Sequence, residues 1–235
     1  MKMILAGSQP DYLPYIGFFH KMSNCDSYMI VDHVQFSKKV FQNRNRIKGK
    51  NGIILLTVPV LTKNKFEQPI KDVLINNQVN WQKKHFRSIT LNYQNATYYD
   101  DFRDFFEKIY SEKWNKLIEL NEYIIMHIAK LLEIDLPIQK SSEFNFVGKK
   151  TDLLIEMCQK TNADIYLSGE GGRAYVDDTK FKKNNLKNYF TNFKHPIYKQ
   201  LSEPFIPKMS TIDLLLNYDL KTSKKIIKGS GIIGE

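Results

Sequence analysis

The sequence predicts an α/β fold, in which a layered, mostly parallel, Rossmann-like sheet carries a central helical insert. Short apolar runs typical of buried strands alternate with segments whose apolar residues recur every three or four positions. Near the start a strand is followed by a helix and a strand, and later a helix and a strand end in a glycine-rich turn. This order favours parallel strands covered by helices over an all-α or all-β fold. The length of 235 residues fits one domain, 1–235, with the insert at about 80–134.

The first predicted elements lie in the N-terminal third of the chain. Residues 3–6 form a buried-type strand, and the helical spacing of apolar residues over 13–22 predicts the first helix. A second strand is predicted over 27–31. β-branched residues and leucines predict a third strand over 53–60, and residues 70–75 are its candidate pairing partner.

The remaining elements are predicted from the same two patterns: short apolar runs for strands, and apolar residues every three or four positions for helices. Three helices form the predicted insert, over 81–93, 98–110 and 117–132. Beyond the insert we expect a helix over 152–159, a strand over 163–167, a strand over 186–190 and a short helix over 212–216. Glycines from position 229 onward predict a loose C-terminal tail.

Composition and charge narrow the class of protein. Hydrophobic residues make up 42% and aromatic residues 13% of the chain, too many for a disordered segment. The net charge is +10, and the scattered lysines fit either a solvated surface or a polyanion-binding face. No apolar run approaches the ~20 residues of a membrane span, and the first apolar run is too short for a signal peptide, so we expect a cytoplasmic protein. The 2 cysteines lack the spacing of a disulfide framework or a zinc site.

A stiff loop after the first strand holds the first candidate site. Gln9, Asp11 and Tyr12 lie among two prolines and two glycines over residues 7–17. Open α/β sheets bind ligands at the carboxyl ends of their strands, so these three side chains are candidate substrate-binding residues. The alternative is a tight turn with buried aromatic rings.

The second predicted strand ends at a cluster of polar residues. Asp32 and His33 could orient each other there, and a histidine that titrates near neutrality can act as a general base. Both are candidate catalytic residues. Gln35 and Lys38 in the same segment are candidate substrate-binding residues.

An Asn-Arg-Asn-Arg block follows this cluster. Alternate side chains of an extended segment share a face, so Arg44 and Arg46 would present two guanidiniums on one face, with Asn43 and Asn45 on the other. Two planar guanidiniums suit phosphate or carboxylate, and all four residues are candidates for substrate binding. The alternative is an edge strand whose arginines form salt bridges.

Two later segments complete the candidate site. Ser168 and Gly169 end a predicted strand and lead through a glycine-rich turn to Arg173, where exposed N–H groups and a guanidinium could cradle an anion. An ordinary flexible turn is the alternative. His195 precedes a proline in a rigid loop that presents its imidazole, which makes it a third candidate catalytic residue.

Taken together, these segments resemble the WbqC-like family over nearly the whole chain. The matching blocks are Gln9-Pro10-x-Tyr12-Leu13-Pro14, Asp32-x-Val34-Gln35, Asn43-Arg44-Asn45-Arg46-Ile47-Lys48, Thr57-Val58-Pro59, Tyr166-Leu167-Ser168-Gly169, His195-Pro196-x-Tyr198 and Phe205-Ile206-Pro207 with Ser210 and Asp213. Proteins of this family occur in bacterial gene clusters for O-antigen, capsule and other surface sugars. The resemblance implies a transferase that moves an acyl or aminoacyl group onto an amino sugar.

A more distant similarity links the chain to class I nucleotidylyltransferases and pantothenate synthetases. The segment Pro14-Tyr15-Ile16-Gly17-Phe18 lies where those enzymes carry a His-x-Gly-His element, and Lys208-Met209-Ser210 is similar to their Lys-Met-Ser loop. Phe18 stands in place of the second histidine, which would stabilise a leaving phosphate. The similarity therefore implies a shared sheet topology and puts adenylate formation in doubt.

The resulting hypothesis is an enzyme with no tightly bound cofactor and no metal. It would bind a nucleotide sugar or another anionic small molecule. An activated acyl donor or a nucleotide is its candidate cofactor, and an acyl carrier protein or an aminoacyl-tRNA is its candidate macromolecular partner. The arginine pair would hold phosphate or carboxylate, Gln9 and Tyr12 would orient the acceptor, and His33 or His195 would take a proton. Two alternatives stay open: a non-catalytic binding module for a nucleotide, a carrier protein or RNA, and an ATP-dependent adenylate-forming ligase.

Overall fold

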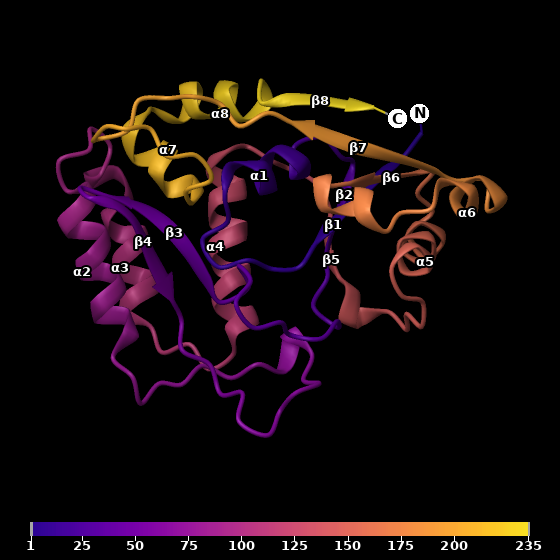
Figure 1. Ribbon diagram of the computed structural model, residues 1–235, viewed down its shortest axis with the longest axis horizontal. Helices are drawn as coiled ribbons and strands as arrows, with labels where there is room; N and C mark the ends of the chain where they lie inside the picture. The colour runs from indigo at the N-terminus through magenta and orange to yellow at the C-terminus, as the bar shows by residue number, and fades with distance from the viewer. Residues whose placement is uncertain (1, 235) are drawn as a thin grey trace.

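A computed structural model describes residues 2–234, and its main feature is a six-stranded sheet with the order β5-β2-β1-β6-β7-β8 (Figure 1). The strands are β1 (Ile4–Ser8), β2 (Ser27–Ile30), β5 (Ile138–Lys140), β6 (Ile165–Ser168), β7 (Lys187–Phe193) and β8 (Gly231–Gly234). Neighbouring strands from β5 through β7 pair in parallel, and β8 pairs antiparallel with β7. The predicted α/β fold with a mostly parallel sheet is therefore confirmed.

Helices cover both faces of this sheet (Figure 1). They are α1 (Ile16–Met22), α4 (Leu117–Leu131), α5 (Thr151–Thr161) and α6 (Asp178–Lys183). Successive side chains of a strand point to opposite faces, so Ala6 packs into the larger core with α1 and α4. Its neighbour Leu5 packs into a second core with α5 and α6. The strand ends are left uncovered between these two layers, and the candidate site lies there.

Three helices lie between β2 and β5 along the chain, in the region where the insert is predicted. They are α2 (Trp81–Tyr93), α3 (Arg103–Ser111) and α4. In α3, Phe105, Phe106 and Ile109 are buried at helical spacing, which is the pattern that predicts this helix. The helix begins later than expected because residues 100–102 form a separate 3-10 turn.

A separate two-stranded sheet carries the Asn-Arg block. Here β3 (Arg44–Gly49) pairs antiparallel with β4 (Gly52–Thr57). The expected pairing of residues 70–75 with the strand over 53–60 is limited to one isolated bridge, from Ile75 to Val60, and a second isolated bridge joins Leu74 to Lys116, so these residues form no continuous partner strand. Residues 70–72 form a 3-10 turn instead, whose N–H groups donate to carbonyl oxygens of residues 32 and 34.

The expectation of a loose C-terminal tail is also wrong. Asp219 accepts a hydrogen bond from the Thr222 backbone N–H at 2.8 Å and so caps a further helix, α8 (Leu220–Lys228). Strand β8 follows it directly. Gly231 has a φ of +148°, and a Cβ atom there would lie 2.2 Å from the Asn192 carbonyl oxygen, so only glycine permits this approach to β7.

Candidate functional site

A cleft of about 510 Å³ opens at the carboxyl end of β1, beside Tyr166 of β6, and is also lined by residues that follow β2 and by α5. The chain runs from β1 to β2 on one side of the sheet and places β6 and β7 on the other, so the strand order reverses at this point. Open α/β sheets bind ligands at such a switch point. Six of the residues that line the cleft are Gly7, Ser8, Gln9, Asp11, Tyr166 and Tyr175.

Gly7 fixes the floor of this cleft. A Cβ atom at this position would lie 2.9 Å from the Met29 carbonyl oxygen and 3.3 Å from the Tyr166 hydroxyl oxygen. No side chain fits between these two groups. The absence of a side chain therefore lets β2 and the Tyr166 ring approach the end of β1 closely.

Asp11 lines the cleft, and Lys21 lies behind that lining, where its charge acts on Asp11. The Lys21 Nζ atom donates a hydrogen bond of 2.7 Å to the Gly7 carbonyl oxygen, and burial lowers the pKa of Lys21 to about 8. Burial raises the pKa of Asp11 to about 7, and the positive charge of Lys21 limits that rise. A carboxyl group that titrates near neutrality thus lies beside a fixed cation, a combination typical of functional sites.

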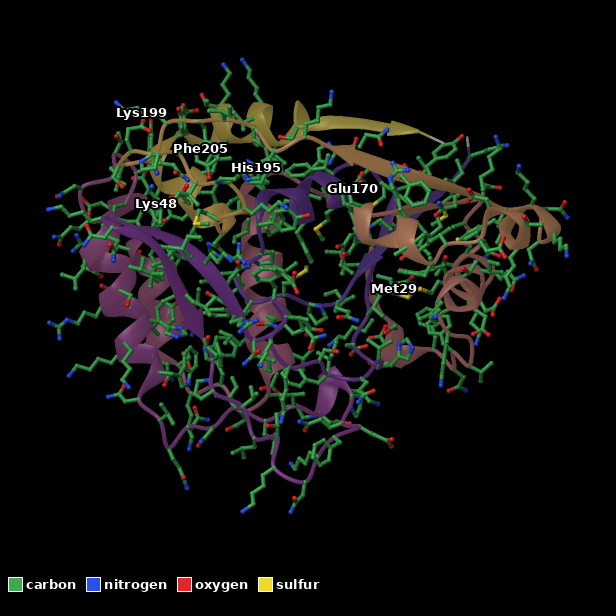
Figure 2. All side chains as sticks on the ribbon, viewed as in Figure 1. Met29, Lys48, Glu170, His195, Lys199 and Phe205 are labelled. Carbon is green, nitrogen blue, oxygen red and sulfur yellow. The ribbon has the colours of Figure 1, made fainter. Side chains whose placement is uncertain are left out.

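Lys21 and Tyr15 are candidate site residues that the sequence patterns did not single out. Lys21 is the one lysine in α1, where every other residue is buried, and this contrast was the available signal. The pKa of the Tyr15 hydroxyl is raised by burial, then by Asp11 and Glu170. Asp11 follows β1, and Figure 2 shows Glu170 on the segment that follows β6. Negative charges from two strand ends therefore raise the pKa of the Tyr15 hydroxyl.

The loop after β1 is held by the segment around the Asn-Arg block. Gln42 Nε2 donates to Gln9 Oε1 at 2.6 Å. Asn45 is buried, and its Nδ2 atom donates to the carbonyl oxygens of Tyr12 at 3.0 Å and Leu13 at 2.8 Å. The structure therefore brings together two segments that the sequence analysis named separately, and it uses Gln9 and Asn45 to fix the loop.

Two other predicted substrate-binding residues point into the interior. The Tyr12 hydroxyl hydrogen-bonds to His85 Nδ1 at 2.9 Å and to the Tyr110 hydroxyl at 2.8 Å, and its side chain is fully buried. Asn43 Nδ2 donates to the Val58 carbonyl oxygen at 2.8 Å. The Tyr12 contacts tie the loop to α2 and α3, the Asn43 contact joins the two ends of the hairpin, and neither side chain faces the cleft.

Arg44 and Arg46 lie on the face of β3 opposite to Asn45, as the alternation predicts. Both are half-buried. The Arg44 guanidinium donates to the Lys39 carbonyl oxygen, and the Arg46 guanidinium lies over the Phe41 ring, 5.5 Å from its centroid. Within residues 2–234 neither arginine forms an ion pair.

Asp32 and His33 meet through Ser141 and not directly. The buried Asp32 carboxylate accepts hydrogen bonds from Ser141 Oγ at 3.0 Å and from Ser142 Oγ at 2.7 Å. His33 Nδ1 lies 2.6 Å from Ser141 Oγ, and burial lowers the pKa of His33. Asp32 thereby anchors the segment after β5 to the end of β2.

Gln35 and Lys38 lie on an exposed segment beyond this cluster. Gln35 Nε2 donates to the Phe66 carbonyl oxygen at 2.7 Å. Lys38 Nζ lies 5.8 Å from the centroid of the Phe66 ring. Both residues line a separate shallow hollow with Phe66, so the structure does not bring them to the cleft between β1 and β6.

The glycine-rich segment after β6 approaches Lys21 at Gly169 and leads to Tyr175, which lines the cleft. A Cβ atom on Gly169 would lie 3.8 Å from Lys21 Nζ, whereas Ser168 Oγ is buried and donates to Asn188 Oδ1 at 2.6 Å. Residues 170–174 form a 3-10 turn. Within it, Arg173 hydrogen-bonds to Glu170 and to Asn192, and its guanidinium stacks over a phenylalanine ring of β7.

His195 lies away from the cleft, in the loop beneath α8 (Figure 2). Its Nδ1 atom lies 2.9 Å from the Pro196 carbonyl oxygen, and its Nε2 atom accepts a hydrogen bond of 2.9 Å from the Lys208 backbone N–H. Burial lowers its pKa, which agrees with a neutral ring protonated at Nδ1. Both ring nitrogens thus hold the backbone of this loop.

Asp213 is the hub of a second buried network. It accepts hydrogen bonds from the Tyr93 hydroxyl at 2.7 Å, the Tyr198 hydroxyl at 2.7 Å and Gln200 Nε2 at 2.8 Å. These partners come from α2 and from the loop before α7 (Thr211–Asn217). The network joins segments that are far apart in sequence, and its position in the interior indicates a structural role.

Across the described part of the chain, no group of three or more His, Cys, Asp or Glu side chains is placed to hold a metal ion. Cys25 and Cys158 are free thiols. Within residues 2–234, none of the helices combines the length and hydropathy that a bilayer span requires.

Comparison with known proteins places these features in a family context. The sequence model of the WbqC-like protein family matches residues 9–225. An uncharacterized protein of Mycobacterium tuberculosis, Rv1507c, is 34% identical over 211 residues, which cover 89% of this chain and 91% of the relative. No solved structure matches the chain.

Proposed function

This chain belongs to the WbqC-like protein family, and we propose that it is a cytoplasmic transferase that moves an acyl or aminoacyl group onto the amino group of a sugar. The observation that carries the proposal is Asp11, a carboxyl group in the cleft at the end of β1 whose pKa is raised by burial and restrained by the charge of Lys21. The glycan context comes from the bacterial gene clusters in which the family occurs. The chemistry comes from a carboxylate that titrates near neutrality in the cleft and from the positive charge behind it.

Asp11 is the proposed general base. In the transfer step, the amine nitrogen attacks the carbonyl carbon of the donor, a C–N bond forms, and the bond from that carbon to the donor's sulfur or oxygen breaks. The leaving group departs with the electron pair, and the amine proton passes to the Asp11 carboxylate. A pKa of about 7 suits this task, because a general base works best when its pKa is near the working pH.

Lys21 is the proposed electrostatic partner of this step. Its ammonium group is fixed behind the lining of the cleft by the hydrogen bond to the Gly7 carbonyl oxygen, so it acts through its charge on Asp11, whose carboxylate form it favours. Asp11 takes the role that the sequence analysis gave to His33 or His195. The reason is that both nitrogens of His195 hold backbone groups, and His33 Nδ1 is engaged by Ser141.

Mass spectrometry of transfer reactions tests this proposal. The full chain is incubated with a UDP-linked amino sugar and, in separate reactions, with acetyl-coenzyme A, an acylated carrier protein and an aminoacyl-tRNA. We expect an amide product with at least one donor, and its loss in the Asp11→Asn variant. Asp101→Asn is the matched control, because Asp101 is exposed on the 3-10 turn before α3.

The two alternatives are outcomes of the same experiment. Product formation that persists unchanged in Asp11→Asn would remove Asp11 from the mechanism. Absence of product with every donor, combined with thermal stabilisation by the same nucleotide-linked sugar, would favour the non-catalytic binding module. Product that forms only when ATP and a free acid replace the activated donors would favour the adenylate-forming ligase.

A further inference from the structure

A second hollow, of about 280 Å³, lies on the other side of the loop that follows β1. It is lined by Tyr15, Phe41, Asn45 and Lys208. Asn45 separates it from the cleft, since its side chain is bonded to the loop backbone between Asp11 and Tyr15. The proposed transfer step uses none of the side chains that line this hollow.

Two aromatic rings form its walls. The Tyr15 ring is fixed in place, because a Cβ atom on Gly17 would lie 2.5 Å from that ring and because Phe193 contacts it edge-on at a centroid distance of 5.8 Å. Phe41 is 39% exposed although its ring is large and apolar. Fixed or exposed rings of this kind offer flat surfaces on which a planar base can stack.

Two cations accompany the rings. The Arg46 guanidinium lies over the Phe41 ring, and Lys208 lines the hollow. Their backbones are close, because the Ser210 N–H donates to the Arg46 carbonyl oxygen at 2.8 Å. Within residues 2–234 neither side chain forms an ion pair, and the Lys208 side chain is exposed. Arginine and lysine together are the usual partners of phosphate groups.

We propose that this hollow binds the nucleoside diphosphate part of an activated sugar, with the base against Tyr15 and Phe41 and the phosphates on Arg46 and Lys208. The inference rests on the proposed function, because the sugar would then extend past the loop toward Asp11. Asp11 and Tyr15 are four positions apart, and that length of chain spans at most about 14 Å. One ligand can therefore occupy the hollow and reach the cleft.

Isothermal titration calorimetry on the full chain tests the proposal. UDP, dTDP, GDP and ADP are titrated first, and the tightest binder is then compared with its nucleoside and with inorganic pyrophosphate. Lys208→Ala should weaken binding of the nucleoside diphosphate and of pyrophosphate by about tenfold or more and leave the nucleoside unaffected. Phe41→Leu should weaken the nucleoside diphosphate and the nucleoside, and leave pyrophosphate unaffected.

Matched controls keep the result interpretable. Lys199→Ala removes an exposed lysine that Figure 2 shows at the edge of the molecule, and it should bind every probe as the wild type does. Urea denaturation establishes that each variant folds, and Lys208→Gln replaces Lys208→Ala if the latter does not. Absence of binding by all four nucleoside diphosphates, or equal binding by Lys208→Ala and wild type, would overturn the proposal.

Failure of this inference is distinguishable from failure of the proposed function. The Asp11→Asn variant should bind the nucleoside diphosphate as tightly as wild type does, because Asp11 lies in the cleft and not in the hollow. Transfer without nucleotide binding would reject the hollow and retain the transferase. Nucleotide binding that follows the expected variants, without transfer to any amino sugar, would reject the transferase and retain the hollow.

Discussion

Lys21 donates a hydrogen bond of 2.7 Å from its Nζ atom to the carbonyl oxygen of Gly7. This bond connects the first helix to the end of the first strand and holds a cation beneath the loop that carries Asp11. Because the pKa of Lys21 is still about 8, its ammonium form predominates at neutral pH in spite of burial. The charge of Lys21 in turn limits how far the pKa of Asp11 rises, so the two groups set each other's titration.

The first prediction concerns Lys21→Met, which keeps the length of the side chain and removes its charge. The buried Gly7 carbonyl loses its donor, and an unpaired buried acceptor costs about 1–3 kcal/mol of unfolding free energy. The pKa of Asp11 should rise above its present value of about 7, since Lys21 is the group that lowers it. Urea denaturation and NMR titration of the Asp11 carboxyl measure the two effects. A lower pKa of Asp11 in this variant would contradict the pairing.

The second prediction concerns the pH dependence of stability. The pKa of Asp11 is about 7 in the folded protein, against an ordinary value of 3.8 for an exposed aspartate. Between these values the folded state binds more protons than the unfolded state, so this group lowers the unfolding free energy as pH rises. Asp11→Asn lacks the titration, and its stability relative to wild type should therefore increase from about pH 4 to about pH 8. Urea denaturation across this range measures the difference, and a constant difference would refute the raised pKa.

The third prediction concerns the arginine pair of β3. Arg44→Ala and Arg46→Ala should each weaken binding of pyrophosphate by roughly 1–3 kcal/mol per lost charged contact. The fold should survive, because neither guanidinium forms an ion pair within residues 2–234. Calorimetric titration with pyrophosphate measures the change. If both variants bind like wild type, or if both unfold, the pair is structural.

The fourth prediction concerns the Asp213 network. Asp213→Ala leaves two tyrosine hydroxyls and the Gln200 amide without their acceptor in the interior, and breaking such a buried polar cluster costs about 3–5 kcal/mol. Tyr198→Phe removes one hydrogen bond from the same carboxylate and should cost less, about 1–2 kcal/mol. Chemical denaturation of both variants provides the comparison. Equal losses would show that Asp213 is not the centre of the network.

The sequence predicts the main sheet well because its strands are short apolar runs and its helices have apolar residues at helical spacing. Residues 3–6 and 163–167 are short apolar runs, and both become central strands. Strand β5 is missed because it has three residues and no fully buried side chain, so it carries no apolar run. The pairing of β8 is missed because its stabilising partner, β7, is distant in sequence and glycine favours no particular element.

The candidate site is harder to predict because side-chain direction depends on tertiary contacts. The alternation of Arg44 and Asn45 follows from strand geometry alone and is found as expected. Tyr12 belongs to the predicted loop but points away from the cleft, since His85 and Tyr110 bind its hydroxyl from two helices of the insert. Those contacts span more than seventy positions of sequence, so local patterns do not reveal them.

The last prediction concerns reaction type, and it depends on Phe18. This residue stands where adenylate-forming enzymes carry a histidine, but its side chain is buried and packs against Phe19 and Tyr28 at centroid distances of 5.3 and 5.8 Å. It therefore offers no donor to a phosphate. Of the Lys-Met-Ser segment, Met209 and Ser210 are buried as well, which leaves Lys208 to face a ligand.

Incubation with ATP, Mg²⁺ and a small acid or amino acid should therefore give no exchange of labelled pyrophosphate into ATP. Charge on a departing pyrophosphate would lack a stabilising group of a kind worth ~3 kcal/mol, and one lysine in an open hollow does not replace a preorganised donor. Activity should instead require a donor activated elsewhere, such as an acyl-coenzyme A, an acyl carrier protein or an aminoacyl-tRNA. Robust exchange with any single acid would reverse this order, because the enzyme would then form its own activated intermediate and the ligase would replace the transferase as the better account of the cleft.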